Sequence, residues 1–189
     1  MRIALTGGIG SGKSYVCSLL KKRGLEVYDC DNAAKKIMRS SINVRQKLIS
    51  VIGQDTYDGD VPNKRCIASF ILASKSNAEK INSIVHPAVA ADYLRSGINF
   101  MECAILFSSG FDKLVDKIVC ISAPLDVRLE RVMKRDKISR DKALEWISCQ
   151  MPQDEVERRS DFIIENDGNT SLEKQIDMML SILSTNINP

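Results

Sequence analysis

The sequence predicts an α/β fold in which a parallel sheet lies between layers of helices. Short apolar runs at residues 2–5, 25–28, 99–107, 117–122 and 161–165 are typical of buried strands. Segments with apolar side chains at helical spacing separate these runs, and strands that alternate with helices pair in parallel. The third observation is a glycine-rich turn between the first strand and the first helix, at the end of the strand where such folds bind ligands.

The glycine-rich turn spans residues 7–14, Gly-Gly-Ile-Gly-Ser-Gly-Lys-Ser, and fits the pattern G-x-x-x-x-G-K-[ST] of a phosphate-binding P-loop. Its glycines allow successive N–H groups to converge on phosphate oxygens at the start of the next helix, 13–23. Lys13 would neutralise the β- and γ-phosphates, and Ser14 would ligate the Mg²⁺ that bridges them. The turn therefore predicts a three-layer P-loop NTPase core that binds a nucleotide with Mg²⁺; the alternative is a glycine-rich turn without a ligand.

Length and composition narrow the class of protein. The 189 residues, 44% of them hydrophobic, are enough for one domain with a sizeable core and small insertions. Lysine and arginine number 27 against 24 acidic residues, and this net charge of +3 is too small to indicate a nucleic-acid binder. No stretch approaches the ~20 apolar residues that span a bilayer, and the N-terminus leads into the P-loop rather than a signal peptide, so a cytoplasmic location is expected.

The six cysteines include no C-x-x-C pair, and the sequence has a single histidine to join them. Neither a zinc site nor a disulfide framework is therefore indicated. We expect reduced cysteines that are mostly small core residues.

Two carboxylates follow the second strand, 25–28, which begins after Gly24 ends the first helix. Asp29 and Asp31 are expected at the carboxyl end of that strand, on the same rim of the sheet as the P-loop, where either could act as a base or a metal partner. The alternative is that Asp31 caps a helix that begins at Asn32.

Residues 32–96 contain an expected run of helices, which is too long for a simple crossover between two strands. The helices are expected at 33–38, 44–52, 65–72 and 78–95, with a turn-rich segment at 54–63. Such an insertion could bind an acceptor substrate. It also holds the only histidine, His86, which precedes Pro87 and is either a packed or capping residue or a catalyst.

The run 99–107 is expected to be a central strand buried on both faces, interrupted by Glu102. A carboxylate in such a strand is costly unless it is paired. Glu102 therefore either contacts the Mg²⁺ shell, as a Walker-B-like residue does, or lies where the strand emerges from the sheet.

A basic helical hairpin follows the strand 117–122. Pro124 opens its first helix, which carries Arg128, Arg131, Lys134, Arg135 and Lys137, and the second helix begins at Ser139-Arg140 and ends by Pro152. Arginines folded over the triphosphate would offset the charge of the transferring phosphoryl group, and Arg140 is expected to do so with Arg135 as a second contributor. The alternative is a solvated charged face.

The chain is then expected to form a last strand at 161–165, a turn at 166–168 and a closing helix at 172–183. The polar tail after Ser184 is expected to fray.

Several blocks, taken in order and spacing, resemble the dephospho-CoA kinase family over nearly the whole chain. They are residues 5–14, Asp29-Cys30-Asp31, His86-Pro87, Ile105-Leu106-Phe107, Ala123-Pro124, residues 131–136, Gln150 and residues 160–168. The sequence departs from the family pattern at four positions. Threonine is usual at the position of Tyr15 and alanine at that of Cys30. A glutamate commonly follows the Leu-Phe pair, at the position of Ser108, and glutamine is frequent at that of Arg128.

The resemblance implies ATP-dependent phosphorylation of the ribose 3′-hydroxyl of dephospho-coenzyme A, the last step of coenzyme A synthesis. It implies one P-loop kinase domain over 1–189, with a core at 1–31, 97–127 and 156–189. A helical acceptor-binding insertion would span about 32–96 and a mobile lid about 128–155. The expected partner is this small molecule, with no nucleic acid and no membrane, and the expected state is a monomer or a small homo-oligomer.

The site residues expected from motif and resemblance fall into two sets. Asp31 is the expected general base, and Lys13 and Arg140 are the other catalytic candidates. The expected ligand-binding residues are Gly8, Gly10, Ser11, Gly12, Lys13, Ser14 and Tyr15, of which Ser14 is also the metal ligand. P-loop, rim aspartate and arginine lid are shared by other small-molecule and nucleoside monophosphate kinases, so these remain the alternative. A regulatory nucleotide switch or a nucleic-acid-dependent ATPase is the alternative from another class.

Overall fold

The computed structural model describes residues 1–185 and divides the chain into two compact units. The first unit comprises Met1–Tyr28 and Ile98–Pro189, and the second comprises Asp29–Gly97. The end of the tail that was expected to fray, 186–189, lies outside the described residues. Within residues 1–185, no helix combines the length and hydrophobicity that a membrane span requires.

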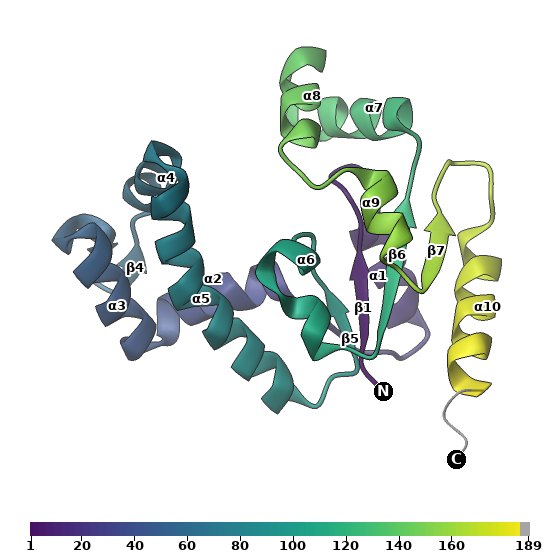
Figure 1. Cartoon of the computed structure of the whole chain (residues 1–189), viewed down its shortest axis with the longest axis horizontal. Coiled ribbons are helices and arrows are strands. Elements are labelled where there is room, and N and C mark those ends of the chain that lie inside the picture. Colours follow the sequence, from purple (N-terminus) through teal and green to yellow (C-terminus); the bar gives the residue numbers. More distant parts are fainter. Residues whose placement is uncertain (186–189) are drawn as a thin grey trace. The chain divides into compact units, whose positions relative to one another are not determined.

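A five-stranded sheet forms the centre of the first unit, with the strand order β2-β5-β1-β6-β7 (Figure 1). Its strands are β1 (Ile3–Thr6), β2 (Val27–Asp29), β5 (Phe100–Glu102), β6 (Lys117–Ser122) and β7 (Phe162–Glu165). The central strand β1 pairs in parallel with β5 and β6, and β6 pairs in parallel with β7. The predicted α/β fold with a parallel sheet is thus confirmed.

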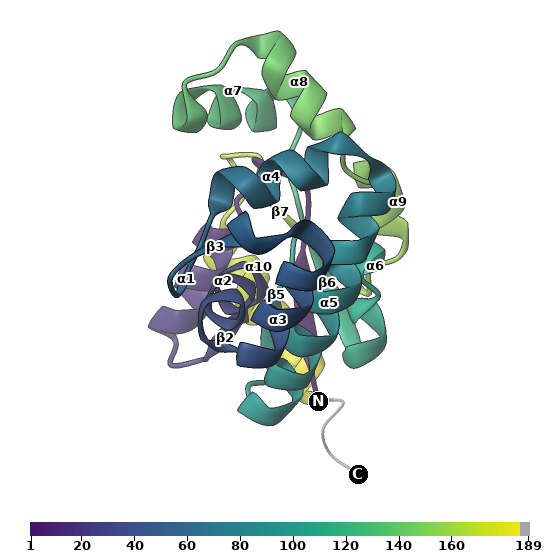
Figure 2. The same ribbon diagram turned by 90° about the vertical axis from the view of Figure 1, so that its left-hand side faces the viewer.

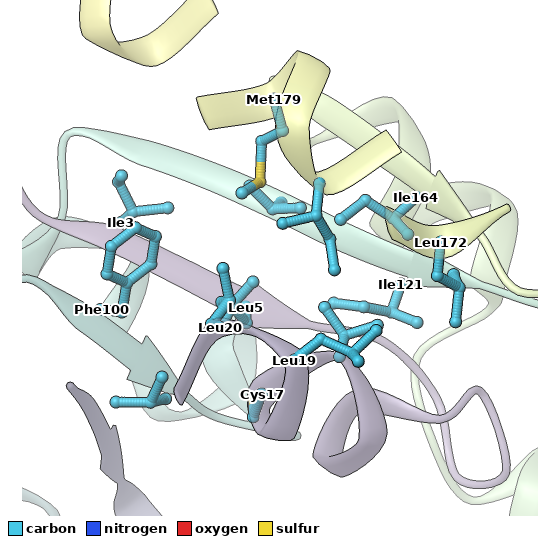
Figure 3. Packing of buried hydrophobic residues seen from close by; sticks show 14 of the residues in the cluster. Ile3, Leu5, Cys17, Leu19, Leu20, Phe100, Ile121, Ile164, Leu172 and Met179 are labelled. Carbon is cyan, nitrogen blue, oxygen red and sulfur yellow. The ribbon is translucent and has the colours of Figure 1, made fainter. Parts of the chain in front are cut away.

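Helices cover both faces of this sheet. Ile3 and Leu5 of β1 pack in one buried cluster with α1 (Lys13–Lys22) and α10 (Leu172–Thr185), as Figure 3 shows. Successive side chains of a strand point to opposite faces. Ser122, at the end of β6, therefore faces away from its buried neighbour Ile121, and its hydroxyl donates to Glu157 of α9 (Gln153–Arg158) at 2.7 Å.

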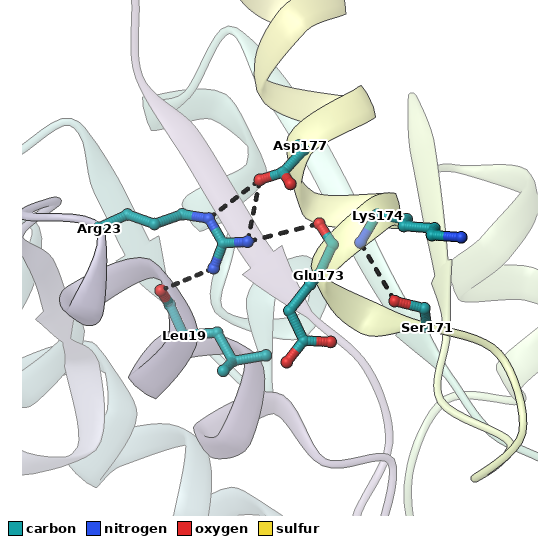
Figure 4. Close-up of polar contacts among 6 residues, drawn as sticks. All are labelled: Leu19, Arg23, Ser171, Glu173, Lys174 and Asp177. Carbon is teal, nitrogen blue, oxygen red and sulfur yellow. Dashed lines mark hydrogen bonds and ion pairs between the residues drawn. The ribbon is translucent and has the colours of Figure 1, made fainter.

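Arg23, just after α1, links the two helices that share one face of the sheet (Figure 4). Its Nε and one terminal nitrogen donate to Asp177 Oδ1 of α10 at 3.0 and 2.9 Å, and another nitrogen donates to Leu19 O at 3.2 Å. Because the Asp177 carboxylate is largely exposed, the pair contributes at most about 1 kcal/mol. Apolar burial between α1, α10 and the sheet is the larger contribution.

The predicted strand 99–107 is wrong beyond Glu102. Cys103 N still donates to Leu5 O at 3.0 Å, but the chain then turns into the short helix α6 (Leu106–Ser109). Leu106 is buried within that helix. A continuous apolar run does not distinguish a buried strand from a buried helix, which is why the prediction extended too far.

The remaining elements of the first unit are short or form the basic hairpin. They are the 3₁₀ helix η2 (Phe111–Leu114) and the hairpin helices α7 (Leu125–Asp136) and α8 (Arg140–Ser148). The helix α9 was not predicted, because its six residues are mostly polar and carry only one buried side chain, Val156.

The second unit consists of helices around α5 (Lys75–Ser96), which buries Ile81, Val85, Val89 and Tyr93. Its other elements are α2 (Cys30–Ser40), α3 (Ile42–Ile52), η1 (Gln54–Thr56), β3 (Tyr57–Asp58), β4 (Val61–Pro62) and α4 (Lys64–Ala73), coloured blue to teal in Figure 2. The segment predicted only as turns, 54–63, contains the antiparallel pair β3–β4. Pro87 lies inside α5 and does not end it.

Side-chain caps set where the helices of the second unit begin. Asp29, Ser41, Asn63 and Ser74 each accept a hydrogen bond from a backbone N–H three residues ahead. The cap of α2 is therefore Asp29, whose Oδ1 accepts from Asn32 N at 2.9 Å. The interpretation of Asp31 as a cap for a helix starting at Asn32 is wrong, because α2 starts at Cys30 and Asp31 lies exposed in its first turn.

Candidate active site

The P-loop connects β1 to α1, and its glycines are required by close approaches of other segments. Gly12 has φ +94°, and a Cβ at this position would lie 2.0 Å from Asn166 Nδ2, which donates to Ser11 O at 2.8 Å. A Cβ on Gly8 would lie 2.3 Å from a terminal nitrogen of Arg128. Tyr15 N donates a hydrogen bond to Gly12 O at 3.0 Å, which forms the first turn of α1. The loop therefore ends at a helix N-terminus, where free backbone N–H groups favour the binding of phosphate.

Lys13 and Ser14 lie at the first turn of α1 and make different contacts. The Lys13 ammonium donates to Gly7 O at 2.6 Å and to Gly8 O at 3.2 Å, so its charge lies over the loop. Ser14 Oγ donates to Glu102 Oε1 at 3.1 Å, where β5 ends beside β1. The structure thus brings together the predicted metal ligand and the carboxylate whose role the sequence left open.

The pair of Ser14 and Glu102 fits Mg²⁺, because that ion prefers oxygen ligands. Among residues 1–185, no group of three or more histidine, cysteine or acidic side chains could hold a metal. A protein that supplies only one or two oxygens is typical of Mg²⁺ sites, where waters and nucleotide phosphates complete the coordination. In the same loop, Ser11 Oγ is buried without a hydrogen-bond partner within the described residues, which fits a site completed by a polar ligand.

Two arginines of α7 donate hydrogen bonds to backbone carbonyls of the P-loop. Arg128, only 5% exposed, donates from Nε to Ile9 O at 2.9 Å, and burial lowers the pKa of its guanidinium. Arg131 donates to Gly10 O at 3.3 Å and to Asn166 Oδ1 at 3.2 Å. Since residues three apart lie on one helix face, both arginines can reach the loop together.

The predicted catalytic arginines lie elsewhere in the hairpin. Arg140, at the start of α8, has its nearest carboxylate oxygen at 3.7 Å on Asp126, and its side chain is 60% exposed. Arg135 pairs with the neighbouring Asp136. The hairpin arginines that contact the P-loop in this structure are therefore Arg128 and Arg131, for which the sequence predicted no contact with the loop.

A cavity of about 490 Å³ opens at the carboxyl ends of β6 and β7, next to Arg128. Its size lies in the roughly 300–1,000 Å³ range of small-molecule sites. The lining side chains come from the strand ends, α7, α9 and the turn after β7: Ser122, Ala123, Pro124, Leu125, Arg128, Gln153, Asp154, Glu157, Glu165 and Asp167. The cavity belongs to the same unit as the P-loop.

The other candidates are placed as follows. Tyr15 is 55% exposed on α1, and Ser108 Oγ donates to Ile105 O at 3.2 Å within its own turn. In the second unit, Asp31 is exposed at the first turn of α2. Burial lowers the pKa of His86, which favours a neutral imidazole at pH 7.

Four of the six cysteines, at positions 17, 30, 103 and 120, are buried, and all six are free thiols. Burial, with the neighbouring Glu102 carboxylate as a second cause, strongly raises the pKa of Cys17. Burial and Glu157 raise the pKa of Cys120 to about 12. Both groups are therefore protonated core side chains and not nucleophiles.

Comparison with known proteins gives a consistent result. The family model described as dephospho-CoA kinase matches residues 1–171. A dephospho-CoA kinase of Bacteroides fragilis is 37% identical over 191 residues, which cover 97% of this chain and 93% of that protein.

Two solved structures have similar folds. The crystal structure of TT1252 from Thermus thermophilus matches with a TM-score of 0.82 and 26% identity, covering 100% of this chain and 98% of the other. A dephospho-CoA kinase from Campylobacter jejuni matches with a TM-score of 0.70 and 22% identity, covering 98% of both chains. The P-loop geometry, with Lys13 over the loop and Ser14 hydrogen-bonded to Glu102, is consistent with this family match over residues 1–171. The chain belongs to the dephospho-CoA kinase family.

Proposed function

We propose that the protein transfers the γ-phosphoryl group of ATP to the 3′-hydroxyl of the ribose of dephospho-coenzyme A, giving coenzyme A and ADP. The observation that carries the proposal is the arrangement at the first turn of α1, where an ammonium, a hydroxyl and a carboxylate surround a glycine-rich loop. Phosphoryl transfer requires little covalent chemistry from the protein, so charge and positioning at this loop supply most of the catalysis.

The nucleotide is proposed to bind along the P-loop through Gly8, Gly10, Ser11, Gly12, Lys13, Ser14 and Tyr15. Ser14 would hold Mg²⁺ directly, and Glu102 would orient the Ser14 hydroxyl through the hydrogen bond that joins the two side chains. When bound, Mg²⁺ would neutralise charge on the β- and γ-phosphates.

The remaining roles are proposed for the other parts of the chain. The helical segment of about 32–96 would bind the acceptor, with Asp31 as the base that orients and deprotonates its hydroxyl. The segment of about 128–155 would act as a lid, with Arg140 reaching the transferring phosphoryl group when the lid closes. We further propose that the protein works in the cytoplasm, as a monomer or a small homo-oligomer.

The direct test is to incubate the protein with ATP, Mg²⁺ and dephospho-coenzyme A and to look for coenzyme A by mass spectrometry. We expect a product heavier by one phosphoryl group, with ADP formed in equal amount. Nucleoside monophosphates, DNA and RNA in place of the acceptor should not stimulate ADP formation. Stimulation by one of these and not by dephospho-coenzyme A would instead support a different kinase or a nucleic-acid-dependent ATPase.

The Ser14→Ala and Glu102→Gln variants are expected to need about tenfold more Mg²⁺ for half-maximal activity, because the first removes the proposed metal ligand and the second removes the charge of the carboxylate that orients it. Calorimetric titration with ATP should show a weaker ATP affinity in both variants when Mg²⁺ is present and an unchanged ATP affinity when it is absent. Glu26→Gln, a change at an exposed carboxylate of the same unit, serves as the control and should behave as the unmodified protein. Variants with an unchanged Mg²⁺ requirement would contradict the ligand role.

Arg140→Lys is expected to lower kcat by more than it weakens ATP binding, because lysine keeps the charge but loses the planar fork that contacts phosphoryl oxygens. The matched control is Arg158→Lys, another exposed arginine whose nearest carboxylate oxygen, on Asp154, also lies 3.7 Å away. Steady-state kinetics and nucleotide titration would be compared for both. If kcat and ATP affinity of Arg140→Lys equal those of the control, the hairpin is a solvated charged face.

A further inference from the structure

The second unit contains a cavity of its own, which neither Asp31 nor His86 lines. Its volume is about 570 Å³, and it lies between α2, β4 and α4, whose positions Figures 1 and 2 show. The apolar part of its wall consists of Met38, Val61, Pro62, Ile67, Ala68 and Ile71. A mostly apolar cavity of this size with a few polar groups is typical of a small-molecule site.

The polar groups of the cavity are all cations. Lys35, Lys36 and Arg39 of α2 and Lys64 of α4 complete its wall, and no carboxylate lines it. Among residues 1–185, none of the four forms an ion pair. Arg45 of the same unit, by contrast, pairs with Asp60.

Cations outnumber carboxylates around this cavity. Lys35 and Arg39 are four residues apart on α2, and like charges at this spacing destabilise a helix. Asp31 is the only acidic residue of α2 and lies four residues before Lys35, and α4 has none, so the two helices supply one carboxylate against the four cations of the cavity. A cleft lined by charges of one sign concentrates ligands of the opposite sign, so this cavity favours an anion.

We propose that this cavity binds the pantetheine arm of the acceptor and that the four cations bind its diphosphate, an inference that rests on the proposed function. The arm is an uncharged chain with two amides and a branched apolar segment, which suits the apolar wall. The diphosphate carries two negative charges, which match cations that have no carboxylate partner.

The order of groups along α2 matches the order of groups in the acceptor. Asp31, Lys35 and Arg39 follow one another at intervals of four residues and lie along one face of the helix. At 1.5 Å per residue, the spacing from Asp31 to Lys35 is about 6 Å and that to Arg39 about 12 Å along the axis. The ribose hydroxyl at Asp31, the diphosphate at Lys35 and Arg39, and the arm in the cavity can therefore follow one another without a turn in the ligand.

Two pairs of variants test this placement. Ala68→Asp puts a carboxylate into the apolar wall, and its control Leu72→Asp puts one on the same helix at a side chain that is 84% exposed and outside the cavity. Lys64→Glu reverses a charge of the cavity, and its control Lys47→Glu reverses an exposed charge on α3. All four positions are exposed and lie outside the buried core, so folded protein is expected for each variant.

The measurements are the KM for dephospho-coenzyme A, the KM for ATP, and the calorimetric affinity for 4′-phosphopantetheine, the half of the acceptor that lacks the nucleoside. We expect Ala68→Asp and Lys64→Glu to raise the KM for the acceptor and to weaken 4′-phosphopantetheine binding by about tenfold or more, because charged hydrogen bonds and apolar burial are lost. The KM for ATP should stay within about twofold, and both controls should match the unmodified protein in all three values.

The inference and the proposed function fail in different ways. If the unmodified protein phosphorylates dephospho-coenzyme A but the cavity variants keep its KM and its 4′-phosphopantetheine affinity, the inference is overturned and the function stands. If the unmodified protein leaves dephospho-coenzyme A unphosphorylated, the proposed function falls and the inference with it.

Discussion

Replacing Lys13 by alanine is expected to lower kcat by about 10³-fold, the largest loss among the single changes considered for the P-loop. The ammonium now lies 2.6 Å from Gly7 O and 3.2 Å from Gly8 O, at the mouth of the loop where the β- and γ-phosphates are proposed to bind. Its charge would be needed most when negative charge moves toward the bridging oxygen during transfer. Alanine removes this charge and leaves no donor in its place.

The experiment compares steady-state kinetics of Lys13→Ala and Lys22→Ala, a matched loss of a lysine at the exposed far end of the same helix. Because Lys13 also bonds two carbonyls of the loop, the thermal unfolding temperature of both variants should be measured beside the rates. Near-normal turnover in a folded Lys13→Ala protein would refute the assignment of residues 7–14 as the phosphate site.

Local sequence was enough to predict the parts of the structure that depend on backbone angles and short spacings. The loop at 7–14 was found because close approach and positive φ demand glycine at positions such as Gly12. Four of the five sheet strands ended within one residue of their predicted carboxyl ends, since each is a short apolar run followed by a turn signal.

The errors came from competition between alternatives that local sequence leaves nearly equal. The run 99–107 is apolar enough for either a strand or a helix, and the packing of Leu106 decides for the helix α6. Asp29 and Asp31 are both good capping residues, and the extended backbone of Asp29 at φ −96°, ψ 105° decides which one caps α2.

The contacts that complete the candidate site could not be predicted because they join residues far apart in the chain. Arg128 bonds Ile9 across 119 residues, Asn166 bonds Ser11 across 155, and Ser14 meets Glu102 across 88. A basic cluster in the sequence does not say which arginine is buried against the loop. The spacing of three between Arg128 and Arg131 was the available signal, since it places both on one face of α7.

Replacing Asp31 by asparagine is expected to lower kcat by about 10²–10⁴-fold while ATP affinity changes little. The reason is that a loose phosphoryl-transfer transition state needs the base chiefly to orient the attacking hydroxyl and to take its proton late. Asparagine keeps the size of the side chain but cannot accept a proton. Asp31 is exposed in the first turn of α2, and its side chain makes no hydrogen bond within the described part of the chain.

Asp29 is the competing carboxylate, and its contacts explain why a milder effect is expected there. Both of its oxygens accept from Asn32, one from the backbone N–H at 2.9 Å and one from the side-chain amide at 2.7 Å. Asparagine is as good an N-cap as aspartate, so Asp29→Asn should keep α2 folded and serve as the matched control. The two variants would be compared for kcat and nucleotide affinity over a range of Mg²⁺ concentrations, with any loss at Asp29→Asn expected to be small and relieved by metal. A larger loss at Asp29 than at Asp31 would reverse the assignment, and full activity in both would leave the pair as the start of a helix and nothing more.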